Sequence, residues 1–294
     1  MGVWESPIVE ERGWGTCAVP DGRDERNRTN FAHGPATVAD VDGDGTLEVV
    51  AVGNTYDCAA NPYQSLYSGI FIFHRDRSRF TGSGFDWTHV PVDTGSPLIE
   101  DYNIIESVHP NPVVVDLDGD GQKETLFPSY DGRMHAFWLD KTEHGSWPYS
   151  IYDSTEGLYR FASEPVVADL DNDGSAEVLF TSWVEKGSEE TGWLHILSSE
   201  GVPVHQVRLP EAYGSPDWNG AMAAPTLDNI DGDADLEIVI NTAHSGIVAF
   251  DLPGTASARV LWGTGRGGYL RAGVAEEQVI FSDGFESADT SFWE

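Results

Sequence analysis

The residues best suited to chemistry are carboxylates that recur at fixed offsets in four nine-residue segments. These segments, called loops 1 to 4, are residues 40–48, 116–124, 169–177 and 229–237. Positions 1, 3, 5 and 9 of each loop carry oxygen-bearing side chains. Alternate residues of a tight turn can point at one centre, and Ca²⁺ prefers six to eight oxygen ligands. The pattern therefore predicts up to four calcium sites.

The predicted ligands are the side chains at positions 1, 3, 5 and 9 and the backbone carbonyl at position 7. They are Asp40, Asp42, Asp44, Thr46 and Glu48 in loop 1; Asp116, Asp118, Asp120, Gln122 and Glu124 in loop 2; Asp169, Asp171, Asp173, Ser175 and Glu177 in loop 3; and Asn229, Asp231, Asp233, Asp235 and Glu237 in loop 4. Glycine at position 6 permits a positive φ, but loop 4 has Ala234 there and Asn229 at position 1. We expect the fourth site to be the weakest or the most distorted.

The EF-hand is the main alternative calcium loop, and the sequence argues against it. An EF-hand requires a bidentate Glu at position 12 and a helix on each side. Position 12 is apolar in all four loops, and the flanking residues are β-branched or aromatic, which favours strands. A set of solvated acidic turns without metal remains open, although three or four carboxylates would then repel one another at close range.

The elements that position the loops are predicted to be strands in a repeated order. The third unit is the clearest, with strands over residues 165–169, 177–183, 193–197 and 204–209. The other units give strands over residues 36–41, 47–52, 69–73 and 87–92; 112–116, 124–128, 134–139 and 147–152; and 225–227, 236–241, 246–250 and 259–262. The first ligands of successive loops are 76, 53 and 60 residues apart, a period that suits the blade of a β-propeller.

The loops and the Pro-Val-Val-x-Asp strand before them resemble the FG-GAP/VCBS repeats of integrin-α-type β-propellers, which occur in many secreted bacterial proteins. The resemblance covers residues 35–262 and implies that calcium joins the two inner strands of each blade. We expect an all-β propeller over residues 1–275, with repeats at 35–111, 112–164, 165–223 and 224–262, and a C-terminal tail over 276–294. Residues 1–34 would form an arm or a closing strand. A fifth blade, closed by residues 4–9, 269–274 and 278–281, is one alternative; a four-bladed ring and a piece of a larger propeller are the others.

Charge and cysteine content narrow the class of partner and the compartment. The formal net charge is −33, and even four bound Ca²⁺ ions would leave a strongly acidic surface, which argues against nucleic acid and anionic membranes as partners. No apolar run is long enough to span a membrane. The two cysteines, Cys17 and Cys58, are expected either to form a disulfide or to be unrelated buried thiols. Loops of this kind need millimolar calcium, so we expect a secreted or cell-surface protein.

No convincing catalytic constellation is present. The glycine-rich run at residues 263–268 lacks the following helix of a phosphate loop, and the sequence contains neither a nucleophile elbow nor a zinc-protease helix. Long segments at the propeller end opposite the acidic loops carry polar and aromatic residues that could contact a ligand. The candidates there are Tyr102, His109, Tyr159, Arg160 and Trp218. Packing of these aromatics onto the blades is the alternative.

The favoured hypothesis is a non-catalytic, calcium-stabilised module that binds a glycan or an extracellular protein; the oligomeric state is unknown. A polysaccharide lyase acting on acidic glycans, of the rhamnogalacturonan-lyase type, is a second hypothesis, with His33, His109, Tyr102, Tyr159 and Arg160 as its candidate residues. A purely structural repeat of a larger secreted protein is the third.

Overall fold

The strands predicted from the sequence dominate the structure, a computed structural model. It describes residues 27–31, 34–57, 64–88, 97–99, 101, 104, 111–268 and 273, with strand residues 27–30, 54–57 and 64–67 described by their backbone alone. Every named element within these ranges is a β-strand, so the all-β prediction is confirmed. None of these residues belongs to a helix that is long and apolar enough to cross a membrane.

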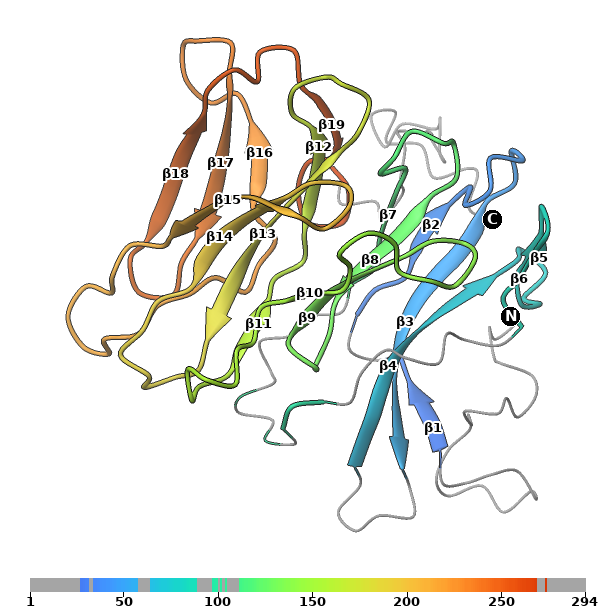
Figure 1. The fold of residues 1–294 in the computed structure, drawn as a ribbon, viewed down its shortest axis with the longest axis horizontal. Helices are drawn as coiled ribbons and strands as arrows, with labels where there is room; N and C mark the ends of the chain where they lie inside the picture. The colour runs from blue at the N-terminus through green and yellow to red at the C-terminus, as the bar shows by residue number, and fades with distance from the viewer. Residues whose placement is uncertain are drawn as a thin grey trace, which may run out of the picture.

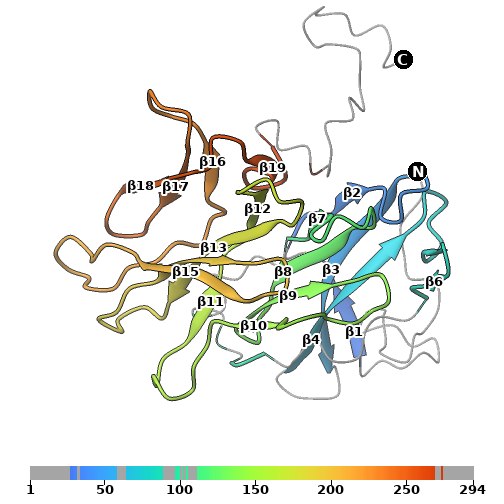
Figure 2. The same cartoon turned by 45° about the horizontal axis from the view of Figure 1, so that its top comes forward.

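Four antiparallel sheets lie side by side along the molecule (Figures 1 and 2). The first sheet contains β1 (Asn27–Asn30), β2 (Thr37–Ala39), β3 (Glu48–Asp57) and β4 (Gln64–Phe73), beside a hairpin of β5 (Thr81–Gly82) and β6 (Phe85–Asp86). The second contains β7 (Val113–Val115), β8 (Glu124–Pro128), β9 (Arg133–Phe137) and β10 (Tyr149–Ser150).

The third sheet contains β11 (Arg160–Ala162), β12 (Val166–Asp169), β13 (Glu177–Val184), β14 (Trp193–Leu197), β15 (Pro203–Arg208) and β19 (Arg259–Trp262). The fourth contains β16 (Thr226–Asp228), β17 (Leu236–Asn241) and β18 (Ile247–Leu252). In each sheet, the two strands that flank the acidic loop pair with each other, and the second of them also pairs with the next strand along the chain, as the repeat pattern predicts.

Apolar side chains from both faces of the inner strands form the core between neighbouring sheets. In β7, Val113 and Val115 pack towards the third sheet, whereas Val114 packs towards the first. In β12, Val167 packs towards the second sheet, while Val166 and Ala168 pack towards the fourth. Because side chains alternate between the faces of a strand, an uninterrupted apolar run is what a strand between two sheets requires. The short Val-Val runs before the loops thus reflect burial on both sides.

One predicted strand has the expected position but the wrong neighbour. Residues 259–262 were expected to form the outer strand of the fourth unit, but β19 pairs with β12 of the third sheet. The reason is burial: Trp262 is 1% exposed and belongs to the core between the second and third sheets. The fourth sheet consequently has only three strands. Of the strand expected over residues 87–92, only Trp87 and Thr88 lie within the described ranges, and both lie outside a strand because β6 ends at Asp86.

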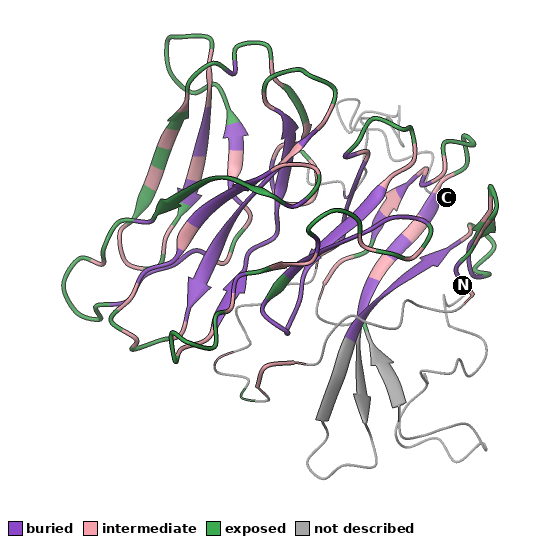
Figure 3. Ribbon diagram, viewed as in Figure 1, coloured by how far each residue is buried: buried purple, intermediate pink, exposed green. Residues whose placement is uncertain are grey.

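The fourth sheet has an open outer face. Residues of β18 alternate between exposed and half-buried, and Ile247 is 75% exposed (Figure 3). Among the described residues, no core cluster joins the first sheet to the fourth, although the Val38 N–H donates to the Gly273 carbonyl at 2.8 Å. The other residues proposed for a fifth blade lie outside the described ranges. Ring closure and blade number therefore stay predictions.

Candidate metal centres

The four acidic loops occupy equivalent places in the four sheets. Each joins the first two strands of a meander: β2–β3, β7–β8, β12–β13 and β16–β17. Figure 1 shows these connections along the same upper edge of the molecule. The strand pairing thus brings together, within each loop, residues that the sequence separates by up to eight positions.

The position-9 glutamate is the most buried carboxylate of its loop in loops 1, 2 and 4. Glu48, Glu124 and Glu237 are each at most 4% exposed. One oxygen of each glutamate accepts a hydrogen bond from the position-2 N–H, at 3.3, 2.7, 2.9 and 2.7 Å in loops 1 to 4. The other oxygen, Oε1, is buried without a hydrogen-bond partner in Glu124 and Glu237. A buried, unsatisfied carboxylate oxygen is costly, so a cation at this point would remove a large penalty.

The aspartates are oriented by backbone N–H groups of their own loop. At position 1, Asp40 accepts from the N–H groups of Asp44 and Gly45 at 3.1 and 2.8 Å. At position 5, the carboxylates accept from the position-7 N–H at 2.6, 2.7, 2.8 and 2.9 Å in loops 1 to 4. The carboxylates are therefore held in place by the backbone before any ion binds.

Three carboxylates converge in every loop. The groups are Asp40, Asp42 and Glu48; Asp116, Asp118 and Glu124; Asp169, Asp171 and Asp173; and Asp231, Asp233 and Glu237. In each group, one oxygen per residue lies within 4.8 Å of the others. Hard, anionic oxygens at this spacing fit Ca²⁺, which takes ligands at about 2.3–2.6 Å. The residues present therefore fit the predicted metal; calcium would supply charge neutralisation and a cross-link between the two strands.

Burial disfavours the ionised form of the position-9 glutamates. Desolvation raises the pKa of Glu124 to about 8 and that of Glu48 to about 6, and it also raises the pKa of Glu177. Nearby aspartates add to each increase, whereas the backbone N–H of position 2 opposes it. A bound divalent cation would act in the opposite direction, because it favours the ionised carboxylate.

Consecutive loops contact one another through their backbones. The N–H at position 8 of one loop donates to the carbonyl at position 2 of the preceding loop: Lys123 to Val41 and Ala176 to Leu117, both at 2.9 Å. A Cβ placed on Gly119 would lie 3.0 Å from the Gly174 carbonyl oxygen, and Gly119 has a φ of +78°. Loops 1 to 3 therefore form one connected row.

Loop 4 departs from this row. Its position-8 N–H, from Leu236, donates to Thr255 Oγ1 at 2.7 Å. The Asn229 side-chain amide donates to the Asp233 carbonyl at 2.7 Å, where the other loops have an accepting carboxylate at position 1. Ala234 does not adopt the positive φ of Gly45, Gly121 and Gly174. The backbone of loop 4 is thus different, which agrees with the expected distortion; its metal affinity stays a prediction.

Side chains that sequence reasoning missed contact the loops from elsewhere, and three of them donate to aspartates. Ser83 Oγ donates to Asp42 Oδ2 at 2.7 Å, and Trp138 Nε1 donates to Asp118 Oδ2 at 3.0 Å. Arg259 donates to Asp169 Oδ2 through Nε at 3.2 Å and Nη2 at 2.9 Å. Burial would raise the pKa of Asp169, but these bonds and two backbone N–H bonds hold it below its usual value. No motif marks these residues, since 20 to 90 positions separate each from its partner.

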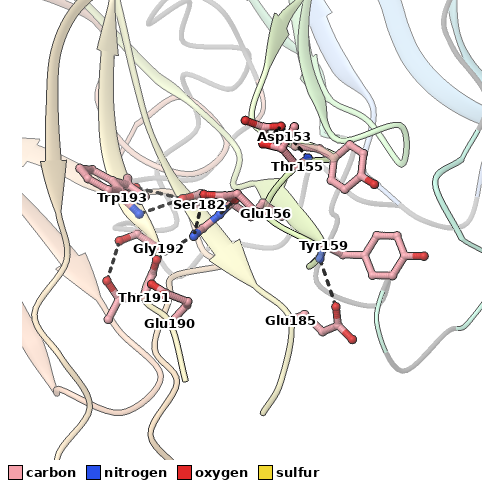
Figure 4. Close-up of polar contacts among 12 residues, drawn as sticks. Asp153, Thr155, Glu156, Tyr159, Ser182, Glu185, Glu190, Thr191, Gly192 and Trp193 are labelled. Carbon is pink, nitrogen blue, oxygen red and sulfur yellow. Dashed lines mark hydrogen bonds and ion pairs between the residues drawn. The ribbon is translucent and has the colours of Figure 1, made fainter. Parts of the chain in front are cut away.

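The predicted ligand residues opposite the loops that the structure describes, Tyr159, Arg160 and Trp218, are half-buried or buried. Tyr159 is half-buried; its N–H donates to Glu185 Oε2 at 3.1 Å, and its ring extends away from the group around Ser182 and Trp193 (Figure 4). The Arg160 side chain is 6% exposed and donates to Glu156 Oε2 at 2.6 Å and the Thr191 carbonyl at 2.8 Å. Their contact with a ligand stays a prediction.

Trp218 is 8% exposed and packs edge-on against Trp183, with ring centroids 4.9 Å apart. A hollow of about 360 Å³ adjoins Trp183 of this pair. Its lining is Trp183, Gly220, Met222, Ala223, Asn241, Thr242 and Ala243. Because loops 3 and 4 enter β13 and β17 at their first residues, the hollow lies at the opposite ends of these strands. The other predicted residues, Tyr102, His109, His33, Cys17 and Cys58, lie outside the described ranges.

Comparison with known proteins identifies a repeat in the middle of the chain. Residues 116–180 match the family described as FG-GAP-like repeat. The match begins at position 1 of loop 2 and ends in β13, so it contains two acidic loops with strands β8 to β12 between them. No curated protein matches the chain. The chain thus contains an FG-GAP-like repeat within an all-β fold.

Proposed function

We propose that this chain is a non-catalytic, extracellular repeat module, stabilised by calcium, that presents a binding surface to a glycan or a protein. The observation that carries the proposal is the buried position-9 glutamate. One of its carboxylate oxygens accepts a hydrogen bond from a backbone N–H. In loops 2 and 4, the other oxygen has no hydrogen-bond partner in the described protein. The matched FG-GAP-like repeat supports an adhesion-like module.

Calcium would act here as a structural ligand. The side chains at positions 1, 3, 5 and 9 would hold it, with the position-7 carbonyl as a further ligand. Because positions 1 and 9 lie at the ends of adjacent strands, one ion would bind both strands of the hairpin. Binding to the folded state alone stabilises a protein by mass action. The millimolar calcium outside cells would suffice for loops of modest affinity, which favours a secreted or surface location.

The binding surface is proposed at the strand ends opposite the loops. The hollow beside Trp183 has mainly aromatic and apolar walls, and Asn241 and Thr242 also line it. Sugars and protein side chains both present an apolar face next to hydrogen-bonding groups, and both suit such a lining. We further propose that the four sheets are successive blades of a β-propeller, in which this surface and the metal loops lie on opposite faces.

The test is a binding screen in calcium. The calcium-loaded protein is applied to a glycan array and used in a pull-down with extracellular proteins, beside the Trp183→Ala variant, which empties one wall of the hollow. Specific retention by the native protein that the variant loses supports the proposal. Empty results in both screens, with a protein that melts cooperatively, would contradict it.

A further inference from the structure

Loop 3 differs from the other loops in one charge. Arg259 in β19 is the register partner of Asp169, the last residue of β12, and its guanidinium lies 2.9 Å from Asp169 Oδ2. Figures 1 and 2 show β19 beside β12 of the third sheet, although the order of units predicts β19 in the fourth sheet. β19 is anchored there by Trp262, which is 1% exposed and pairs with Val167. The placement of Arg259 thus follows from the core.

The number of hydrogen-bond donors on Asp169 Oδ2 distinguishes loop 3 from loops 1 and 2. Asp169 Oδ2 accepts from Arg259 Nε at 3.2 Å, Arg259 Nη2 at 2.9 Å and the Gly174 N–H at 3.1 Å. A carboxylate oxygen offers about two lone-pair sites, so three donors saturate it. In the described structure, the same oxygen of Asp40 and Asp116 accepts only from the N–H of position 6, at 2.8 and 3.0 Å. An ion can therefore reach that oxygen in loops 1 and 2 without displacing a side chain.

The converging carboxylates show the same distinction. In loops 1, 2 and 4 the group of three includes the position-9 glutamate, whereas in loop 3 it consists of Asp169, Asp171 and Asp173 without Glu177. The guanidinium of Arg259 places a permanent positive charge next to Asp169, the position-1 ligand of loop 3.

We propose that Arg259 is a tethered cation that holds loop 3 in the calcium-free protein and competes with calcium for Asp169. This inference rests on the calcium proposal above. Loop 3 consequently binds calcium more weakly than loop 2, although its acidic residues at positions 1, 3, 5 and 9 are complete. In the third sheet, Arg259 holds Asp169 without an ion. Loops 1 and 2 therefore carry most of the calcium dependence of the fold.

The test is calcium titration by calorimetry of the native chain and of Arg259→Met, which keeps an unbranched apolar side chain and removes the guanidinium and its charge. We expect one site to gain roughly fivefold in affinity, as removal of a partly exposed ion pair allows. Arg208→Met is the matched control, because Arg208 is also a partly exposed strand arginine, paired with Glu190 at 3.2 Å and Glu211 at 3.4 Å, outside the acidic loops. It should leave every affinity unchanged.

A second change assigns the gain to loop 3. Adding Asp171→Asn to Arg259→Met should abolish the gained site and leave the others. In chelator, Arg259→Met alone should lower the melting temperature, and calcium should recover it. Native protein that binds calcium with affinities unchanged by Arg259→Met would overturn the tethered-cation inference alone. Native protein and variant that both bind none at millimolar calcium would overturn the calcium proposal and the inference together.

Discussion

Replacing Glu124 with glutamine should have opposite effects on stability with and without calcium. The pKa of Glu124 is raised from 4.5 to about 8 in the calcium-free fold, mainly by burial. The folded state therefore binds this proton more tightly than the unfolded state. The resulting stabilisation is fully present below pH 4.5 and is lost as the pH rises through 8. At pH 7 the loss amounts to about 3 kcal/mol, at 1.36 kcal/mol per pH unit above 4.5.

Glutamine is neutral at every pH and can still accept the Leu117 N–H that Glu124 accepts at 2.7 Å. In chelator at pH 7, Glu124→Gln should therefore exceed the native protein in stability by up to about 3 kcal/mol, and the difference should vanish near pH 4. In calcium the order should reverse, because the variant lacks one anionic ligand.

The assay is urea unfolding at pH 4, 5, 6, 7 and 8, with calcium or with chelator. Glu211→Gln, at a side chain 80% exposed, controls for the loss of one negative charge. A Glu124→Gln variant that is less stable than the native protein under all conditions would refute the reasoning, as would a chelated native protein whose stability does not change across this pH range.

Three further predictions concern the loops and the second sheet. Gly119→Ala should destabilise by about 1–3 kcal/mol, because its Cβ would meet the Gly174 carbonyl at 3.0 Å with φ at +78°; Gly84→Ala, also at positive φ but with no atom within 4 Å, should cost less in the same urea experiment. Buried His135 bonds to Asp131 at 3.1 Å and Glu143 at 3.0 Å; burial would lower its pKa, but these bonds raise it to about 9. The stabilisation from the protonated His135 should be complete below pH 6.5 and should be lost as the pH rises through 9, a change of about 3 kcal/mol in the free energy of unfolding. His135→Gln should remove this dependence of stability on pH, and an unchanged dependence would refute the pairing. Asn229→Asp with Ala234→Gly should strengthen calcium binding at one site by calorimetry, and unaltered affinities would show that the two substitutions do not limit loop 4.

The strand pattern was predictable wherever burial is local. Residues 124–128, 193–197 and 236–241 form strands with the predicted bounds because polar turns delimit apolar runs. The neighbour of β19 was not predictable in this way. Its place depends on the packing of Trp262 against side chains of the second and third sheets, and such a choice between two possible partners leaves no trace in periodicity.

The loops themselves follow from residue type and spacing, and so does the different backbone of loop 4. The sequence makes loop 3 look as complete as loop 2, yet Arg259 reaches it from 90 residues away. The orientation of the glutamates was also hidden: only the fold shows that a backbone N–H fixes one oxygen of Glu124 and leaves the other buried without a partner.

The most direct test of calcium stabilisation is thermal unfolding of the same protein before and after exhaustive chelation, with its metal content measured. The loops predict bound calcium before chelation, a lower melting temperature after it and recovery when calcium is restored. A metal-free protein that melts at the same temperature with and without added calcium would contradict the account.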